Sequence, residues 1–154
     1  MNIEYEVIEH QAIYSENEEN SGMFPSNILI GKNLFLRTAN KSAYYLYSLP
    51  LHKKADLKKL SSKLNEKRFS FANEQELEYF MKITPGAVSY LNVITSDYLN
   101  GEYKNVKYII DKKLFSKEKI GFHPSKNSLT VVTTPDVIEK IYNEYDLDYK
   151  IMEV

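Results

Sequence analysis

The sequence predicts a mixed α/β (α+β) fold, with one β-sheet core and helices packed on its flanks. Runs rich in β-branched and aromatic residues recur along the chain, between segments whose apolar residues have helical spacing. These two kinds of segment do not alternate regularly, which disfavours a doubly wound parallel sheet. The 154 residues contain no internal repeat, low-complexity tract or linker. We therefore expect a single domain over residues 1–154.

The first half of the chain predicts an edge strand, a short helix and a hairpin. "IEYEVI" alternates apolar and acidic residues as a half-exposed strand does. In "YSENEEN", Ser15 and Glu18 have the spacing of a capping box, which predicts a short helix. "KNLFLRT" and "AYYLYSLP" are β-rich and are joined by the turn-forming "ANKS", so a β-hairpin that ends at Pro50 is expected.

Two amphipathic helices flank the next short strand, "RFSFA". "DLKKLSSKLNEK" predicts a helix that Asp56 caps, with its lysines outward. "NEQELEYFMK" opens with a capping box of Asn73 and Glu76 and is stopped by "TPG". The apolar faces consist of Leu57, Leu60 and Leu64 in the first helix and of Leu77, Phe80 and Met81 in the second.

The second half predicts four strands, a helix and a final strand. "AVSYLNVI" and "NVKYIID" are separated by "TSDYLNGEYK", where Asn100-Gly101 marks a turn. "KIGFH" and "SLTVVT" lie on either side of the polar "PSKN". Thr134 is the expected cap of a helix with Pro135 at its first position. Its apolar face would hold Val137, Ile138, Ile141, Tyr142 and Tyr145, and "YKIMEV" would add a last strand.

Composition excludes several classes of protein. Hydrophobic residues make up 43% and charged residues 27% of the chain, and no apolar run approaches the roughly 18 residues of a membrane helix. The acidic start "MNIEYEVIEH" lacks the basic and apolar regions of a secretory signal, so a cytoplasmic protein without a membrane partner is expected. Without cysteine, the chain has no disulfides, thiolate metal sites or cysteine nucleophiles.

Charge is unevenly distributed although the net charge is only −1. Residues 1–20 carry six glutamates and no lysine or arginine. Residues 41–70 carry eight basic residues against Asp56 and Glu66, a local balance of +6. A segment of this kind can follow a phosphate backbone, and a solvated helix face is the alternative interpretation.

Most familiar catalytic motifs are missing. His10, His52 and His123 lie far apart and none has a partner at a metal-ligand spacing, so no metal is expected. The sequence has neither a Walker loop nor a G-x-G-x-x-G fingerprint, and no cofactor is expected. No G-x-S-x-G elbow supports a serine triad.

Three polar interruptions of apolar sequence remain as candidate sites. In "GKN", Lys32 either extends from a strand end into water or is held near a ligand anion. In "TPGAVS", the glycine either frees backbone N–H groups to face a ligand or makes a plain turn. In "GFHPSKN", His123 is either structural or part of a site.

These stretches are similar, in order, to a known family. "EHQAIYS", "KNLFLR", "YYLYSLP" with "ADLKKLSSKL", "RFSFANEQEL", "ITPGAVS", "VKYIIDKKLF" and "IGFHPSKNSLTV" resemble the YbaK/prolyl-tRNA-synthetase-associated domain superfamily. Within it, the chain looks like the freestanding aminoacyl-tRNA deacylases of the ProXp-ala (PrdX-like) subgroup. The resemblance runs from about residue 8 to the last helix.

The resemblance implies a trans-editing hydrolase. Such proteins hydrolyse the ester of mischarged tRNA, in this subgroup alanine attached to proline tRNA, after the synthetase has released it. The implied partners are the acceptor end of mischarged tRNA(Pro) and prolyl-tRNA synthetase. The family fold, a mixed sheet with packed helices, agrees with the fold predicted from the residues.

The family's functional residues can be carried over by position. Its essential lysine falls on Lys32, the neighbouring asparagine on Asn33, the glycine of its G-x-x-x-P loop on Gly86, and the histidine that shapes a small pocket on His123. Backbone N–H groups from Gly86 to Val88 would stabilise the oxyanion. A terminal ribose hydroxyl could assist the attack, and a small pocket would exclude the larger cognate proline.

The implied site is extended by neighbouring residues. Catalytic roles fall on Lys32, Gly86, Ala87 and Val88; substrate binding on Asn33, Thr84, Ser89, Tyr90, Phe122 and His123; and tRNA contacts on Lys53, Lys54, Lys58, Lys59 and Lys63. Tyr90 stands where the family loop has proline, which leaves the amino-acid specificity open. The alternatives are a deacylase for another mischarged tRNA (serine, threonine or cysteine) and a noncatalytic tRNA- or synthetase-binding module.

Overall fold

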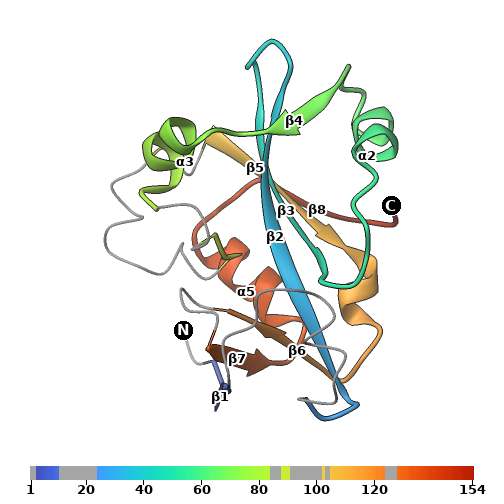
Figure 1. The fold of residues 1–154 in the computed structure, drawn as a ribbon, viewed down its shortest axis with the longest axis vertical. Helices are drawn as coiled ribbons and strands as arrows, with labels where there is room; N and C mark the ends of the chain where they lie inside the picture. The colour runs from blue at the N-terminus through green and yellow to red at the C-terminus, as the bar shows by residue number, and fades with distance from the viewer. Residues whose placement is uncertain (1–2, 11–23, 84–87, 91–101, 103–104, 124–127) are drawn as a thin grey trace.

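The computed structural model describes residues 3–10, 24–83, 88–90, 102, 105–123 and 128–154. Within them, eight strands form one mixed sheet in the order β1-β7-β6-β2-β3-β5-β8, with β4 also paired to β2. The fold class predicted from the sequence, a mixed sheet with flanking helices, is confirmed (Figure 1). The strands are β1 (Glu6–Glu9), β2 (Ile28–Thr38), β3 (Tyr44–Pro50), β4 (Phe69–Phe71), β5 (Val106–Asp111), β6 (Lys119–Phe122), β7 (Leu129–Thr133) and β8 (Tyr149–Met152).

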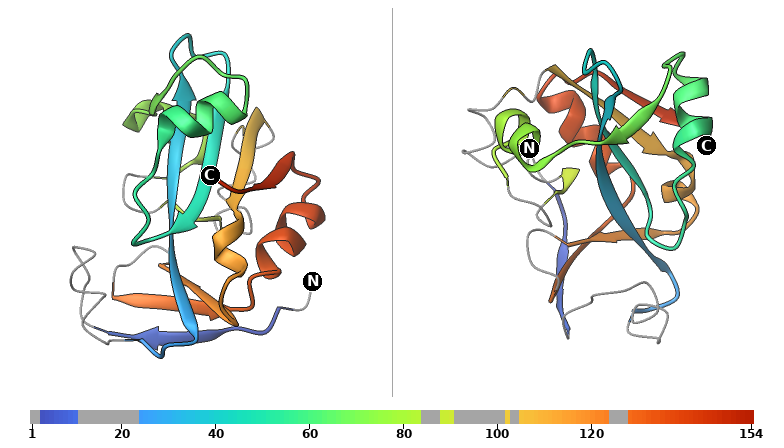
Figure 2. Two further views of the ribbon diagram at one scale, coloured as in Figure 1. Left: turned by 90° about the vertical axis from the view of Figure 1, so that its right-hand side faces the viewer. Right: turned by 45° about the horizontal axis from the view of Figure 1, so that its top comes forward.

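Three α-helices and one 3-10 helix complete the described elements: α2 (Leu57–Lys63), α3 (Glu74–Met81), α5 (Val137–Glu144) and η3 (Lys112–Phe115). The two faces of the sheet carry separate cores. One core packs α3 and α5 against β2, β3, β5 and β6, and the other packs α2 and β4 against β2, β3 and β5. Figure 2 shows α2 and α5 at well-separated places around the sheet.

Strand β2 joins the two parts of the sheet. Its first residues, 28–30, pair in parallel with β6, residues 31–37 pair with β3, and residues 36–38 pair with β4. Residues 36 and 37 of β2 pair with both β3 and β4, so β4 lies on the edge of β2 opposite β3. Strand β6 lies on that same edge, because β2 stands between β6 and β3 in the sheet. On that edge, no strand of the described residues pairs with residues 31–34. Figure 1 shows β2 running between β6 at its lower end and β4 at its upper end.

Several local predictions are confirmed. The hairpin of β2 and β3 has the expected antiparallel register, and the tail forms β8 beside β5. The side chain of Asp56 accepts a hydrogen bond from the Lys59 amide and so caps α2. The capping box of Asn73 and Glu76 is complete in both directions. Edge strand β1 lies beside β7.

Three local predictions need correction. Residues 88–90 are not a strand: Ser89 and Tyr90 are successive and both fully buried, so the segment enters the core instead of alternating between two faces. Helix α2 ends at Lys63, because Leu64 caps it. Helix α5 begins at Val137 after a turn in which the Val137 amide bonds the Thr134 carbonyl, so Pro135 is not its first residue.

Some predictions lie outside the described residues. These are the capping box of Ser15 and Glu18, the turn at Asn100-Gly101 and the "PSKN" connection.

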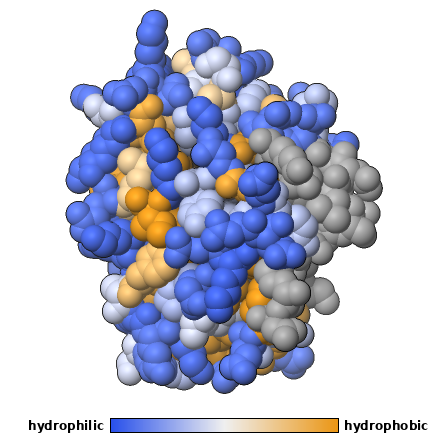
Figure 3. All heavy atoms as spheres, turned by 180° about the vertical axis from the view of Figure 1, so that it is seen from behind, coloured by the Kyte–Doolittle hydropathy of each residue, from blue (hydrophilic) through white to orange (hydrophobic). Residues whose placement is uncertain are grey.

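On the face seen in Figure 3, apolar side chains gather in a short strip within a largely hydrophilic surface. Among the described helices, none is long and apolar enough to cross a membrane.

Candidate functional site

The three polar interruptions of the sequence meet in one hollow of about 220 Å³. Its walls come from the start of β2, the end of β3, the segment after α3 and the end of β6. The lining residues are Gly31, Lys32, Asn33, Leu51, Val88, Phe122 and His123. The hollow therefore lies at the edge of β2 between β6 and β4. The side chains of neighbouring strand residues point to opposite faces of the sheet. Lys32 and Asn33 therefore reach the hollow from opposite faces at this edge.

An aromatic ring fills the space beside Gly31. A Cβ atom on Gly31 would lie only 2.2 Å from the Phe122 ring. Phe122 itself is almost completely buried, and the ring of Tyr90 packs edge-on against it at 4.8 Å between centroids. Because Gly31 has no side chain, the Phe122 ring can approach β2 closely and form the base of the hollow, with the Tyr90 ring packed behind it.

Asn33 is oriented by its partner across the hairpin. The Ser48 hydroxyl, fully buried, donates to the Asn33 Oδ1 atom at 2.5 Å, and the two residues are direct register partners. Since the amide oxygen accepts this bond, the Asn33 NH₂ group is the part of the amide that can donate to a ligand. Ser48 therefore turns Asn33 into a donor.

His123 is held on one side of its ring. Its Nδ1 atom lies 2.9 Å from the Leu129 carbonyl oxygen, and the His10 ring lies 5.7 Å away. Burial lowers the pKa of His123, the bond to Leu129 opposes this, and the charge of His10 adds to it, so the net shift is downward. A lowered pKa makes the neutral imidazole the dominant form at neutral pH.

The remaining predicted site residues fall into two groups. Thr84, Gly86 and Ala87 lie outside the described residues. Ser89 and Tyr90 are described and fully buried. Tyr90 lies behind Phe122, not in the lining of the hollow, and its burial raises its pKa to about 12.

The five lysines predicted to contact tRNA do not share one environment. Lys53 Nζ donates to the buried carboxylate of Asp111 at 2.6 Å and to the Val154 carbonyl at 2.7 Å. Lys63 donates to the Glu153 carbonyl. Lys54, Lys58 and Lys59 are exposed. Lys53 and Lys63 thus hold the segment after β8.

A second, cationic hollow of about 360 Å³ lies between α2 and β4. Lys58, Lys67 and Arg68 contribute its charge, and all three are exposed. Leu57, Ser61 and Phe69 complete its lining. The hollow lies beside the end of β2 that pairs with β4, so it is separated along the strand from Asn33.

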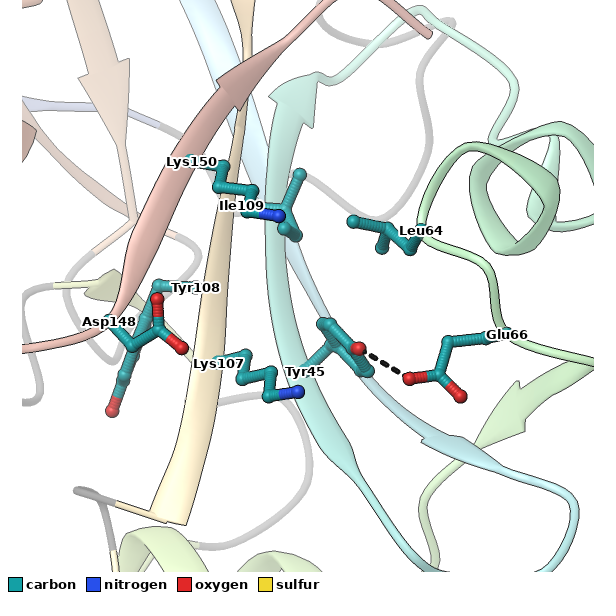
Figure 4. Close-up of a pocket in the computed structure, with 8 residues that line it drawn as sticks. All are labelled: Tyr45, Leu64, Glu66, Lys107, Tyr108, Ile109, Asp148 and Lys150. Carbon is teal, nitrogen blue, oxygen red and sulfur yellow. Dashed lines mark hydrogen bonds between the residues drawn. The ribbon is translucent and has the colours of Figure 1, made fainter.

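A third hollow, of about 110 Å³, contains none of the predicted residues (Figure 4). Tyr45 donates to Glu66 at 2.8 Å, and Lys107 extends over the Tyr45 ring with its ammonium 5.7 Å from the centroid. Burial, followed by the bond to Glu66, raises the pKa of Tyr45. Tyr45, Glu66 and Lys107 thus interact with one another in this hollow. Among the described residues, no cluster of three or more His, Asp or Glu could hold a metal.

Reasoning from sequence missed the residues behind the hollow. Ser48 is a lone hydroxyl in the apolar run "YYLYSLP", and counting across the expected hairpin would have placed it opposite Asn33. Leu51, directly after Pro50, also lines the hollow. Thr130 and His10 contact each other although they lie 120 residues apart in the sequence. No pattern within a short stretch of sequence could predict that contact.

Comparisons with known proteins place the chain in a family. Residues 14–141 match the family of aminoacyl-tRNA editing domains. The chain is 35% identical over 154 residues to the prolyl-tRNA editing protein ProX of Acetoanaerobium sticklandii, covering all of this chain and 91% of that protein. It is 25% identical over 138 residues to the prolyl-tRNA synthetase associated domain-containing protein 1 of Bos taurus, covering 87% and 77% of the two chains.

A solved structure shares the fold. The crystal structure of a candidate trans-editing enzyme for prolyl tRNA synthetase superposes with a TM-score of 0.66 at 14% identity. The match covers 97% of this chain and 85% of that one. At this identity the likeness supports the architecture alone.

Proposed function

This chain belongs to the aminoacyl-tRNA editing domain family and is an aminoacyl-tRNA deacylase, and we propose that the mischarged tRNA it clears is alanine attached to proline tRNA. The observation that carries the proposal is the hollow that unites Lys32, Asn33, Val88, Phe122 and His123. The name of the relative from Acetoanaerobium sticklandii, a prolyl-tRNA editing protein, supports proline tRNA as the carrier.

Size is the proposed basis of selection. The rings of Phe122 and Tyr90 close its base, and Gly31 leaves no room for them to move toward β2. Alanine fits such a space more easily than the bulkier proline ring, which is the logic of a second sieve.

The reaction is ester hydrolysis. Water adds to the ester carbonyl, the tetrahedral intermediate collapses, and the ribose oxygen leaves and takes up a proton. The proposed donors to the oxyanion are backbone N–H groups from Gly86 to Val88, of which Val88 lines the hollow. Lys32 would hold the aminoacyl end or its phosphate by charge, and Asn33 would donate from its NH₂ group.

Contact with the tRNA body is proposed for the cationic hollow. Lys58, Lys67 and Arg68 can contact phosphates there, whereas Lys53 and Lys63 already bind the segment after β8. Phe69 lines the cationic hollow and pairs with Thr38 of β2. The distance along β2 from Asn33 in the first hollow to Thr38 beside the cationic hollow is about 17 Å. A few single-stranded nucleotides at the tRNA end can bridge this separation.

A panel of aminoacyl-tRNAs tests the proposal. We expect Ala-tRNA(Pro) to be deacylated faster than Pro-tRNA(Pro) and faster than tRNAs carrying serine, threonine or cysteine. Lys32→Ala should lower kcat/KM by about 100-fold, and Lys150→Ala, at an exposed lysine on the distant β8, should not.

Each alternative has its own outcome in this panel. Faster turnover of a seryl, threonyl or cysteinyl tRNA would replace alanine as the substrate. Equal turnover by the wild-type and Lys32→Ala proteins on every tRNA would remove Lys32 from the catalytic site and favour a noncatalytic binding module.

A further inference from the structure

A chain of three polar groups lies behind His123. The His123 Nδ1 atom is 2.9 Å from the Leu129 carbonyl oxygen and 3.3 Å from the Thr130 hydroxyl. The same hydroxyl is 2.8 Å from the Nε2 atom of His10. Thr130 is completely buried, so water does not compete for its hydroxyl.

The direction of the hydrogen bonds follows from the chemistry of the groups. A carbonyl oxygen can only accept, so the Nδ1 atom of His123 must carry the hydrogen that points to Leu129. Thr130 cannot donate to a nitrogen that already carries a hydrogen, so its oxygen accepts at this contact. Its own hydrogen is then available for His10 Nε2. In a neutral His123 ring, the lone pair is therefore on Nε2.

Strand β1 brings His10 to this place. Antiparallel pairing of β1 with β7 continues beyond the strand end, where the His10 amide donates to the Ser128 carbonyl at 3.0 Å. The His10 ring packs edge-on against Phe24, with 5.3 Å between centroids. A ring fixed in this way keeps its Nε2 atom at hydrogen-bond distance from the Thr130 hydroxyl.

We infer that Thr130, backed by His10, is a positioning residue that acts as a second acceptor beside the Leu129 carbonyl, and that the two together hold His123 as the Nδ1–H tautomer and so turn the bare Nε2 atom toward the hollow. This inference rests on the proposed function for its consequence: Nε2 would accept a hydrogen bond from a hydroxyl or ammonium group at the aminoacyl end. Among the residues that the structure describes, the charged or titratable groups around His123 are His10 of the β1 end and Lys32 across the hollow.

The tautomer can be measured directly. In a ¹H–¹⁵N correlation spectrum of the imidazole rings at pH 7.5, a bare ring nitrogen resonates well downfield of a protonated one. We expect His123 of the wild-type protein to show a protonated Nδ1 and a bare Nε2. In Thr130→Val, which replaces the hydroxyl with a methyl group and leaves the Leu129 carbonyl as the remaining acceptor for Nδ1–H, we expect the Nε2–H tautomer to appear as a minor fraction beside the Nδ1–H form. Thr130→Ser should restore the wild-type pattern.

Kinetics on Ala-tRNA(Pro) test the consequence. Groups that orient a functional side chain typically contribute ~10–100-fold. We expect kcat to fall about tenfold in Thr130→Val with KM little changed, and Thr130→Ser to recover most of the loss. His10→Gln should move the His123 spectrum in the same direction as Thr130→Val. Thr38→Val removes another buried hydroxyl, at the far end of β2, and should leave the His123 spectrum unchanged.

The two proposals fail separately. A wild-type His123 with a protonated Nε2 would overturn this inference whatever the activity. So would Thr130→Val and Thr130→Ser proteins with the same spectrum and the same kcat. If the wild-type protein deacylates no aminoacyl-tRNA, the proposed function fails, and the imidazole spectrum still decides whether Thr130 sets the tautomer.

Discussion

Gly31 faces the ring of Phe122 at a distance that leaves no room for a side chain. An added Cβ would lie 2.2 Å from the ring, far inside normal contact, and Tyr90 holds the ring from behind. In Gly31→Ala we expect the ring to be displaced, with a loss of about 1–3 kcal/mol in the free energy of unfolding. Urea denaturation measures this change.

A second substitution at the ring provides the control. In Gly31→Ala/Phe122→Leu, the smaller side chain makes room, so part of the lost stability should return relative to Phe122→Leu alone. Gly31→Ala with wild-type stability would show that the ring is not confined.

Ser48 contacts Asn33, which lines the hollow, and does not line the hollow itself. Ser48→Ala removes the donor to the Asn33 amide oxygen, so the amide can rotate and its NH₂ group is no longer directed. We expect kcat for deacylation to fall about tenfold, with a stability loss of about 1 kcal/mol.

Ser61→Ala is the matched control for Ser48→Ala. Ser61 is another buried serine, whose hydroxyl donates to the Lys58 carbonyl within α2. It should cost similar stability and leave kcat unchanged. Equal kcat values for the two variants would contradict the role of Ser48.

The lowered pKa of His123 predicts a dependence of stability on pH. Burial lowers this pKa in the folded protein, while the unfolded chain has the ordinary value of about 6.5. Below that pH the unfolded state binds more protons, so the free energy of unfolding falls as the pH drops below about 6.5. Urea denaturation at pH 7.5 and 5.5 should show a smaller fall for His123→Gln than for the wild type.

His52→Gln is the comparison for that measurement. His52 is exposed in the turn after β3, so its removal should leave the wild-type fall in stability unchanged. Equal falls in the two histidine variants would contradict the assignment to His123.

At the residue scale, the sequence predicted most of the residues that line the hollow but not the residues that orient them. The stretches "GKN", "TPGAVS" and "GFHP" interrupt apolar runs, and a polar residue in such a run is conspicuous. Lys32, Asn33, Val88, Phe122 and His123 indeed line one hollow. Ser48, Thr130 and His10 act by pairing with distant residues, and no local pattern contains that information.

At the scale of elements, α2 and β4 form the cationic surface. The triple variant Lys58→Ala/Lys67→Ala/Arg68→Ala should weaken tRNA binding and leave kcat unchanged, because the three side chains lie away from the hollow proposed as the site of hydrolysis. Each lost phosphate contact reduces the slope of log K against log salt by about 0.7–0.9. We therefore expect the slope to fall by about 2, measured by binding titrations at several salt concentrations.

A variant of equal charge change controls for general electrostatics. Lys112→Ala/Lys113→Ala/Lys117→Ala removes three exposed lysines around η3. If this variant lowers the slope as much as the first, attraction by the whole protein explains the binding and the α2–β4 surface does not.

Element boundaries were predictable where the chain caps itself locally. Asn73 with Glu76 and Asp56 with the Lys59 amide each satisfy helix N–H groups from within three residues. The strand expected after "TPG" was wrong over residues 88–90. This segment enters the core instead of alternating between two faces of a sheet, and a short apolar run of that kind cannot be told from a buried strand by its sequence.

At the scale of the molecule, a buried ion pair ties β5 to the turn after β3. Asp111 is fully buried and accepts from Lys53 Nζ and from the Tyr47 hydroxyl. Lys53→Ala would leave this carboxylate without its cation, and we expect a loss of about 3 kcal/mol in the free energy of unfolding. Lys54→Ala, at the exposed neighbour, should change it by no more than about 0.5 kcal/mol. Thermal or urea denaturation of the two variants checks this, and equal stabilities would contradict it.

The sheet order was the least predictable feature of the fold. The hairpin of β2 and β3 follows from two neighbouring runs and a turn. The pairing of β2 with β6 joins residues 91 positions apart, and the pairing of β1 with β7 joins residues 120 to 126 positions apart. The sequence of a strand says little about such a distant partner. The mixed character of the sheet could be predicted, but the order of its strands could not.

The arrangement around β2 also has a consequence for the order of folding. Contacts between neighbouring segments form before those that close long loops. The hairpin that carries Lys32, Asn33 and Ser48 should therefore form early, while His123 arrives only when β6 joins β2 in parallel. A nascent or partly folded chain would hold half of the hollow and would not yet hydrolyse an ester. Activity should then recover on refolding at the rate of the slow, long-range step, not with the hairpin.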